Sequence, residues 1–203
     1  MSRRVAKIVN FVALAAVMSA GAACGGSTGR GATRVPYSDP NAVGYLALCN
    51  RAGEVITSGS VNSVPFVWRA VSSEPAAKPY NNPFRTAILL AYQPQEGLEP
   101  TEWTGEQLTA STRYSNPSHP MAEATTRDQS LNWFLANYAP RWDGFVQLRL
   151  YLGTADEPEY SLNYPALNIQ VIGRTWHVVD PRPLNCKAGI AESIESMLLP
   201  PKT

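Results

Sequence analysis

Apolar and polar residues alternate at every second position in several parts of the chain, which is the pattern of β-strands. In Val146–Leu152 the apolar residues fall on one face and Gln, Arg and Tyr on the other, so a half-buried strand is expected. Leu167–Val171 alternates in the same way. Gly173 provides a turn before Trp176–Val179, and the sequence therefore predicts a hairpin.

Further segments have the composition of strands, and one has the periodicity of a helix. The first two flank turn residues at 50–53 and are expected to form a second hairpin. The expected strands are Gly44–Cys49, Glu54–Ser58, Phe66–Val71, Ala87–Gln93 and Leu108–Tyr114. Arg127–Tyr138 places its apolar residues on one helical face, and Pro140 follows, so we expect a helix there.

These elements predict a mainly β fold, with 17 prolines punctuating the loops. We expect a two-sheet antiparallel sandwich, immunoglobulin-like or jelly-roll-like, with one short helix in a crossover and a short C-terminal helix. The second helix is indicated by Ile190, Ile194 and Leu198, which recur at helical spacing. The expected sandwich domain covers residues 37–188, and the C-terminal tail covers residues 189–203.

The first 23 residues have the features of a signal peptide. Basic residues at positions 3, 4 and 7 precede an apolar run that is too short to span a bilayer as a mature helix. Small residues then lead to Cys24, a pattern that resembles a bacterial lipoprotein signal, in which this cysteine is lipidated. Cleavage after Ala22 is the alternative and would give a secreted protein. Residues 24–36 are rich in Gly, Ser and Thr and are expected to form a flexible tether.

The chain has three cysteines, an odd number for an exported protein. If Cys24 carries a lipid, Cys49 and Cys186 remain as a pair. We expect them to form a disulfide that closes a loop of 137 residues and joins the first strand to the end of the domain. Two unrelated buried thiols are the alternative, which an oxidising compartment disfavours.

Charge and hydropathy restrict the partners. Residues 1–23 carry three of the 17 basic residues and none of the 16 acidic ones, so 14 basic residues remain against 16 acidic, a formal charge of −2. The sequence contains no cluster of basic residues of the kind that would indicate nucleic-acid binding. No later apolar run approaches the roughly 20 residues of a transmembrane helix. The expected attachment is therefore to the outer face of the cell membrane, through the N-terminal lipid alone.

Sequence motifs of common catalytic centres are missing. With only His119 and His177, a histidine-rich metal site cannot be built, and we expect no metal and no cofactor. One loop nevertheless gathers carboxylates around Trp103, as in the paired carboxylates of a glycosidase. They belong to Glu96, Glu99, Glu102 and Glu106. An extracellular hydrolase using this loop is therefore kept as the alternative to a binding domain.

Aromatic residues are more numerous than one small sandwich core needs, with five tryptophans and nine tyrosines. Trp103 falls in an expected loop, and we expect it to act with Tyr114 as an exposed recognition surface. Such rings stack on sugars or anchor a protein partner. The leading expectation is a non-catalytic, exported binding or envelope-structural domain with a glycan or envelope protein as its partner.

Five segments carry a likeness to other sequences. They are Leu48–Gly59, Pro65–Val71, Arg85–Pro94, Thr112–Asn116 and Tyr164–Val171. Together they resemble a family of uncharacterised exported proteins of actinobacteria, over about residues 43–186. The resemblance implies an exported or anchored protein, and it brings no activity, substrate or catalytic residue with it.

Overall fold

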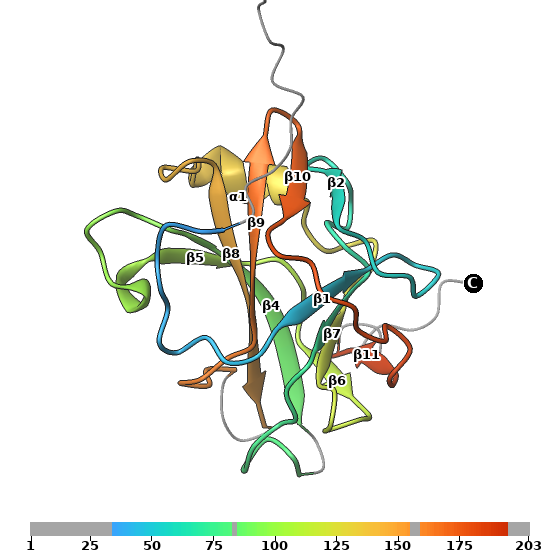
Figure 1. Cartoon of the computed structure of the whole chain (residues 1–203). Coiled ribbons are helices and arrows are strands. Elements are labelled where there is room, and N and C mark those ends of the chain that lie inside the picture. The colour runs from blue at the N-terminus through green and yellow to red at the C-terminus, as the bar shows by residue number, and fades with distance from the viewer. Residues whose placement is uncertain (1–33, 83–84, 155–158, 195–203) are drawn as a thin grey trace, which may run out of the picture.

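The computed structural model describes residues 34–82, 85–154 and 159–194, and these residues form two antiparallel sheets packed as a sandwich (Figure 1). The smaller sheet has the strand order β1-β3-β7, and the larger has the order β11-β6-β4-β8-β9-β10-β2, with β5 paired to β4. The mainly β fold and its two-sheet antiparallel architecture are thus as expected from the sequence. The expected signal peptide, Cys24 and most of the expected tether lie outside the described residues.

Most of the strands and both helical elements are short. The small sheet consists of β1 (Leu46–Cys49), β3 (Arg69–Ser72) and β7 (Met121–Glu123). The large sheet consists of β2 (Ser58–Ser60), β4 (Thr86–Gln93), β5 (Thr104–Gln107), β6 (Thr112–Tyr114), β8 (Phe145–Gly153), β9 (Ala166–Ile172), β10 (Thr175–Val178) and β11 (Ala191–Ser193). The helical elements are the 3-10 turn η1 (Pro100–Glu102) and the helix α1 (Leu131–Asn137).

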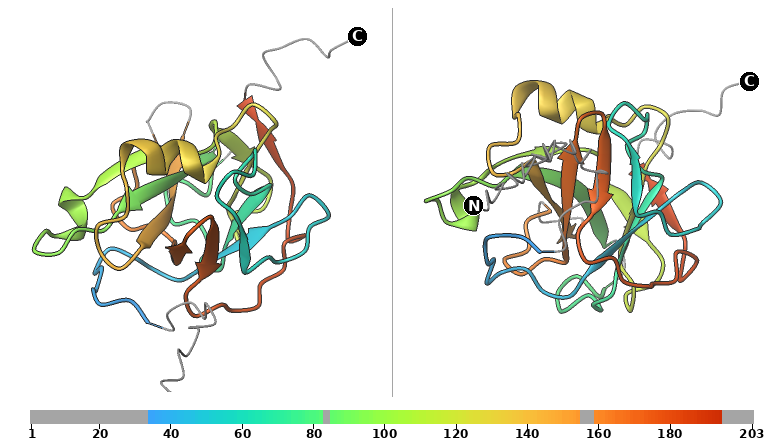
Figure 2. Two further views of the ribbon diagram at one scale, coloured as in Figure 1. Left: turned by 90° about the horizontal axis from the view of Figure 1, so that it is seen from above. Right: turned by 45° about the horizontal axis from the view of Figure 1, so that its top comes forward.

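The main core lies between the two sheets. Trp176 of β10 meets there the fully buried leucines of β1, β4 and β8, which are Leu46, Leu48, Leu89, Leu148 and Leu150. The helix α1 lies across one end of the sandwich (Figure 2), where its Leu131 and Phe134 complete this core. It begins later than predicted, because the Ser130 side chain accepts a hydrogen bond from the Trp133 N–H and caps the first turn.

The second face of the large sheet is also buried, which corrects the expectation of a half-buried strand. All nine residues of β8 are buried, including the polar Gln147 and Arg149, which are 1% and 2% exposed. The cover comes in part from the N-terminal segment, residues 34–43, which runs alongside the sheet before the chain enters β1 (Figure 1), and in part from Pro100 and Trp103. Backbone hydrogen bonds from Val43 N–H to Tyr164 O (2.9 Å) and from Tyr164 N–H to Asn41 O (3.1 Å) hold it in place.

One predicted hairpin is confirmed, and the other forms only next to its turn. Strands β9 and β10 pair across Gly173, whose φ of +60° suits the tight turn. The turn at residues 50–53 also forms, with backbone hydrogen bonds from Asn50 N–H to Glu54 O and from Ile56 N–H to Leu48 O (both 2.9 Å) around a bridge between Cys49 and Val55. The strand ladder of β1, however, is made with β3. The chain instead crosses to the large sheet, where β2 pairs with β10. Gly59 allows this, since a Cβ there would lie 2.7 Å from the Trp176 ring.

The C-terminal part differs from its prediction as well. Residues 191–193 form β11, which pairs with β6, so the sheet extends into the expected tail. Most of the expected C-terminal helix lies outside the described residues. Strands β5 and β7 were not predicted, and β6 begins four residues later than expected. No helix among the described residues is long and apolar enough to cross a membrane.

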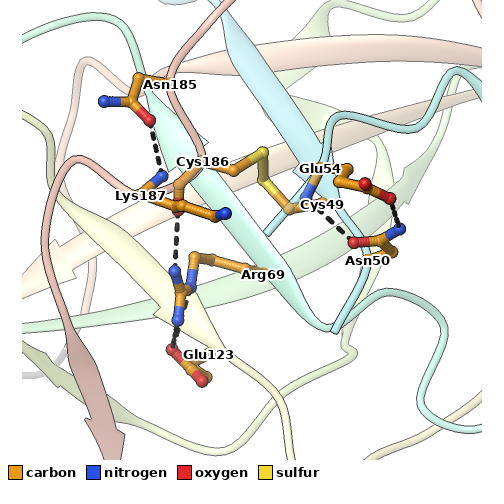
Figure 3. Close-up of a disulfide and its surroundings, with 8 residues drawn as sticks. All are labelled: Cys49, Asn50, Glu54, Arg69, Glu123, Asn185, Cys186 and Lys187. Carbon is orange, nitrogen blue, oxygen red and sulfur yellow. Dashed lines mark hydrogen bonds and ion pairs between the residues drawn. A yellow bond between two sulfur atoms is a disulfide. The ribbon is translucent and has the colours of Figure 1, made fainter. Parts of the chain in front are cut away.

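The predicted disulfide between Cys49 and Cys186 is confirmed, with the two Cα atoms 6.1 Å apart (Figure 3). It ties the end of β1 to the segment before β11. Arg69 of β3 reinforces the link, because its guanidinium donates to the Cys186 carbonyl oxygen (2.7 Å) and forms an ion pair with Glu123 (2.6 Å). The segment around Cys186 is therefore joined covalently to β1 and through a charged side chain to β3.

Candidate functional site

The expectation that Trp103 and Tyr114 form an exposed surface is wrong. They are 4% and 3% exposed. The Trp103 indole turns onto the second face of the large sheet and donates to the Leu98 carbonyl oxygen at 3.2 Å. Tyr114 occupies an inward position of β6 and donates to the Tyr80 carbonyl oxygen at 2.7 Å. Neither ring is available to stack on a ligand at the surface.

The acidic loop does not form a cleft of converging carboxylates. Glu99 and Glu102 make a capping box around η1, in which the Glu102 carboxylate accepts from the Glu99 N–H at 3.0 Å. Glu106 lies on β5 opposite Ala91 of β4. None of the four glutamates lines either of two pockets that open among the described residues. The loop therefore uses its carboxylates for local structure.

A buried arginine is the main electrostatic feature of the second face. The guanidinium of Arg149 donates to Gln147 Oε1 at 2.6 Å, to the Pro100 carbonyl oxygen at 2.9 Å and to the Tyr151 hydroxyl at 3.3 Å. It also lies 3.6 Å from the Asp39 carboxylate, and these two side chains are 2% and 3% exposed. The ion pair and the neutral acceptors together offset the cost of removing the charge from water.

Aromatic rings surround this cation. The guanidinium carbon lies 3.8 Å from the ring centre of Tyr92, 4.6 Å from that of Tyr164 and 5.5 Å from that of Trp103. These distances suit cation–π attraction, which is stronger where water is excluded. We call this set, with Asp39 and Arg149, the arginine cage. The surplus of aromatic residues noted in the sequence thus serves in part to bury a charge.

The arginine cage anchors the N-terminal segment. Asp39 receives hydrogen bonds from the Tyr164 hydroxyl (2.9 Å) and from the Asn41 N–H (3.0 Å). Next to it, the Tyr37 ring packs on Trp103, with centres 4.9 Å apart, and its hydroxyl donates to Asn168 Oδ1 at 2.9 Å. Burial raises the pKa of both tyrosines above its usual range, so both phenols act as neutral donors.

A pocket of about 280 Å³ opens between this anchored segment and the large sheet. One wall comes from residues 34–45, the floor from β8 and β9, and the opposite wall from the segment after β10. Its polar and aromatic lining consists of Arg34, Tyr37, Asp39, Tyr45, Gln147, Asn168, Asp180 and Arg182. We call it the N-terminal pocket. The volume is near the lower end of that of small-molecule sites.

Two amide side chains in the N-terminal pocket are oriented by their neighbours. Gln147 Oε1 accepts from Arg149, and Asn168 Oδ1 accepts from the Tyr37 hydroxyl. Because each carbonyl oxygen faces a donor, each NH₂ group must point the other way. Neither NH₂ group has a hydrogen-bond partner among the described residues. The pocket therefore presents two pre-oriented donors that only a ligand or water can satisfy.

Charged residues form the rim. Asp180 and Arg182 pair with each other at 2.9 Å, and the Arg182 backbone N–H donates to the Tyr45 hydroxyl at 3.0 Å. Asp180 has a φ of +54°, a conformation that L-residues seldom adopt and that fixes the rim's path. Arg34, in contrast, forms no ion pair with any described residue. The rim thus contributes one guanidinium that is not neutralised.

The described residues do not form a metal site or a catalytic arrangement around a histidine. Within the described ranges, no three His, Cys, Asp or Glu side chains are placed to hold a metal ion. His119 contacts the Ser72 carbonyl oxygen at 3.1 Å, and His177 lies half-buried on β10. What the N-terminal pocket offers is hydrogen bonding and charge.

Sequence reasoning missed the residues that build this site. Gln147 and Arg149 were assigned to an exposed strand face, and Asp39 and Asn168 were not considered. A pattern of polar residues at alternate positions is the same whether that face meets water or a covering segment. The one feature of the sequence that could have indicated a buried arginine was the large number of tyrosines and tryptophans before and after the strand that contains Arg149.

Comparison with known proteins gives no assignment, because no family model, no curated protein and no solved structure matches this chain. The resemblance to exported actinobacterial proteins therefore stays a prediction.

Proposed function

We propose that this protein is an exported, lipid-anchored domain of the cell envelope that binds a small polar ligand without chemical turnover. The observation that carries the proposal is the N-terminal pocket, in which Gln147 and Asn168 present pre-oriented donors that no described residue satisfies. Groups fixed before a ligand arrives reduce the entropy cost of binding. A pocket built in this way suits recognition.

The same residues argue against catalysis in the pocket. Both carboxylates that line it are engaged, Asp39 with Arg149 at 3.6 Å and Asp180 with Arg182 at 2.9 Å. A hydrolase needs an acid and a base with different proton affinities, or a nucleophile beside a base. The pocket phenols do not supply a nucleophile, since burial raises the pKa of Tyr37 and of Tyr45.

Export and anchoring rest on other features. The Cys49–Cys186 disulfide suits an oxidising compartment outside the cytoplasm. Its formation leaves Cys24 as the odd cysteine, next to the small residues expected of a lipoprotein signal. Lipidation there would hold the pocket close to the outer face of the membrane, at the end of the expected tether.

The proposal is tested by thermal unfolding of the full chain in detergent, with a panel of small envelope components. The panel contains neutral and acidic monosaccharides, amino acids and blocked dipeptides. A ligand present at 100 times its Kd adds about 2.7 kcal/mol to the free energy of unfolding, which raises Tm by several degrees. We expect such a rise with at least one class of compound.

A filled pocket provides the matched control. Ala42 lines the pocket, and Ala42→Leu adds three carbons there. This variant should keep its fold, as judged by circular dichroism, and lose the ligand-induced rise in Tm. Arg174→Gln, at the exposed β9–β10 turn, should behave as wild type. No rise with any compound, or conversion of a compound to product, would contradict the proposal.

A further inference from the structure

The N-terminal pocket is richer in donors than in acceptors. Within the described part of the chain, the NH₂ groups of Gln147 and Asn168 have no hydrogen-bond partner, and the Arg34 guanidinium of the lining has no ion-pair partner. In the Arg182 guanidinium, Nε and Nη2 donate to Asp180, so Nη1 is left as a further donor. A ligand that satisfies these groups must present several acceptors.

The charges point the same way. Asp39 and Asp180 are the two carboxylates of the lining, and each has an arginine partner. Arg34 is then the one charged group of the lining without an opposite charge among the described residues. Unpaired guanidinium and amide donors favour an anion, and a carboxylate accepts such bonds at two oxygens.

Gln147 places this donor set below the surface. It is 1% exposed and lines the pocket. Its NH₂ group is therefore open to water or to a ligand in the pocket, and a bound carboxylate could accept from it in place of water. The volume of about 280 Å³ limits the ligand to the size of a monosaccharide or a dipeptide.

We infer that the N-terminal pocket recognises a small ligand by its carboxylate, an inference that rests on the proposed binding function. Two sources share this chemistry: an acidic sugar, and the free C-terminus of a short peptide. The donors of Gln147, Asn168 and Arg34 receive the carboxylate oxygens and the neighbouring polar groups. The remaining lining, which includes Val35, Ala166 and Leu167, contacts the carbon skeleton.

Titration calorimetry on the full chain in detergent tests this inference with two pairs of probes. Glucuronate is compared with glucose, and acetyl-Ala-Ala with its C-terminal amide. We expect the acid of at least one pair to bind at least tenfold more tightly than its neutral partner, and more weakly at high salt. Which acid binds identifies the source of the carboxylate.

Three variants locate the effect. Asn168→Asp keeps the acceptor for Tyr37 and replaces the unpaired NH₂ group by a negative oxygen, so acid binding should fall at least tenfold. Arg34→Gln removes an exposed charge outside the core and should also weaken acid binding. Arg174→Gln, the matched loss of an exposed arginine elsewhere, should not.

The outcomes separate this inference from the proposed function. Equal binding of the acid and its neutral partner, or acid binding that both pocket variants retain, overturns the carboxylate inference and leaves a binding domain. Failure of all four probes, together with the whole panel above, overturns both.

Discussion

Replacing Arg149 with methionine removes the buried cation and keeps much of the side-chain volume. Asp39 would then be a carboxylate that is 3% exposed, with only the Tyr164 hydroxyl and one backbone N–H as donors. Removing one partner of a buried ion pair typically costs about 3–5 kcal/mol, because the remaining charge is uncompensated. Oxygens of Gln147 and Pro100 lose their donor as well.

We therefore predict that Arg149→Met lowers the free energy of unfolding by about 3–5 kcal/mol, or Tm by roughly 6–20 °C for a domain of this size. Urea unfolding followed by tryptophan fluorescence measures the loss. Arg141→Met serves as the control, since Arg141 is exposed, and should stay within about 0.5 kcal/mol of wild type.

A second substitution isolates the charge. Asp39→Asn in the Arg149→Met background removes the uncompensated carboxylate and should restore about 1–3 kcal/mol of the loss. The reasoning is refuted if Arg149→Met unfolds at the wild-type urea concentration, or if Asp39→Asn adds its own full cost instead of restoring stability. Either result would mean that the arginine cage does not hold the N-terminal segment through charge.

Four other predictions concern separate parts of the chain. Reducing the disulfide, which closes a loop of 137 residues, should cost roughly 4–5 kcal/mol in the loop-entropy model, and non-reducing peptide mapping should find the linked pair in native protein. Gly144 and Gly97 both have a φ of +81°, but a Cβ at Gly144 would lie 2.6 Å from a carbonyl oxygen, whereas a Cβ at Gly97 would have no atom within 4 Å. Gly97→Ala should therefore lower the free energy of unfolding by about 1–2 kcal/mol, and Gly144→Ala should lower it clearly more, as measured by thermal unfolding. Burial raises the pKa of Tyr37, so its stabilising contribution is complete below about pH 10, the unfolded value, and is lost as pH rises above it; Tyr37→Phe should show a smaller loss of unfolding free energy between pH 8 and pH 11. Cys24→Ala should release the protein or leave it unprocessed, and an intact mass that begins at an unmodified Ala23 in the wild type would contradict lipidation.

The parts of the fold that the sequence predicted are those decided by local pattern. The β9–β10 hairpin follows from alternation on both sides of Gly173, and the central strand β4 from its continuous apolar run. The disulfide followed from the compartment and the cysteine count. Each of these inferences needs only neighbouring residues or a simple count.

The parts that it could not predict depend on contacts between distant residues. The polar face of β8 is buried because Asp39, 110 positions earlier, lies over Arg149. Likewise β2 leaves the expected hairpin, because residues 57–60 bond to β10 of the large sheet. The candidate site lies in this covered region, and its donors could be identified only from the partners that their oxygens already have.

The most direct test of binding in the N-terminal pocket is hydrogen exchange of the full chain, followed by mass spectrometry, with and without saturating ligand from the panel above. We predict that protection rises in peptides covering residues 34–45, 166–170 and 179–182 and stays unchanged in the acidic loop around Glu102. Protection that rises elsewhere while these three segments exchange as before would contradict the assignment of this pocket as the binding site.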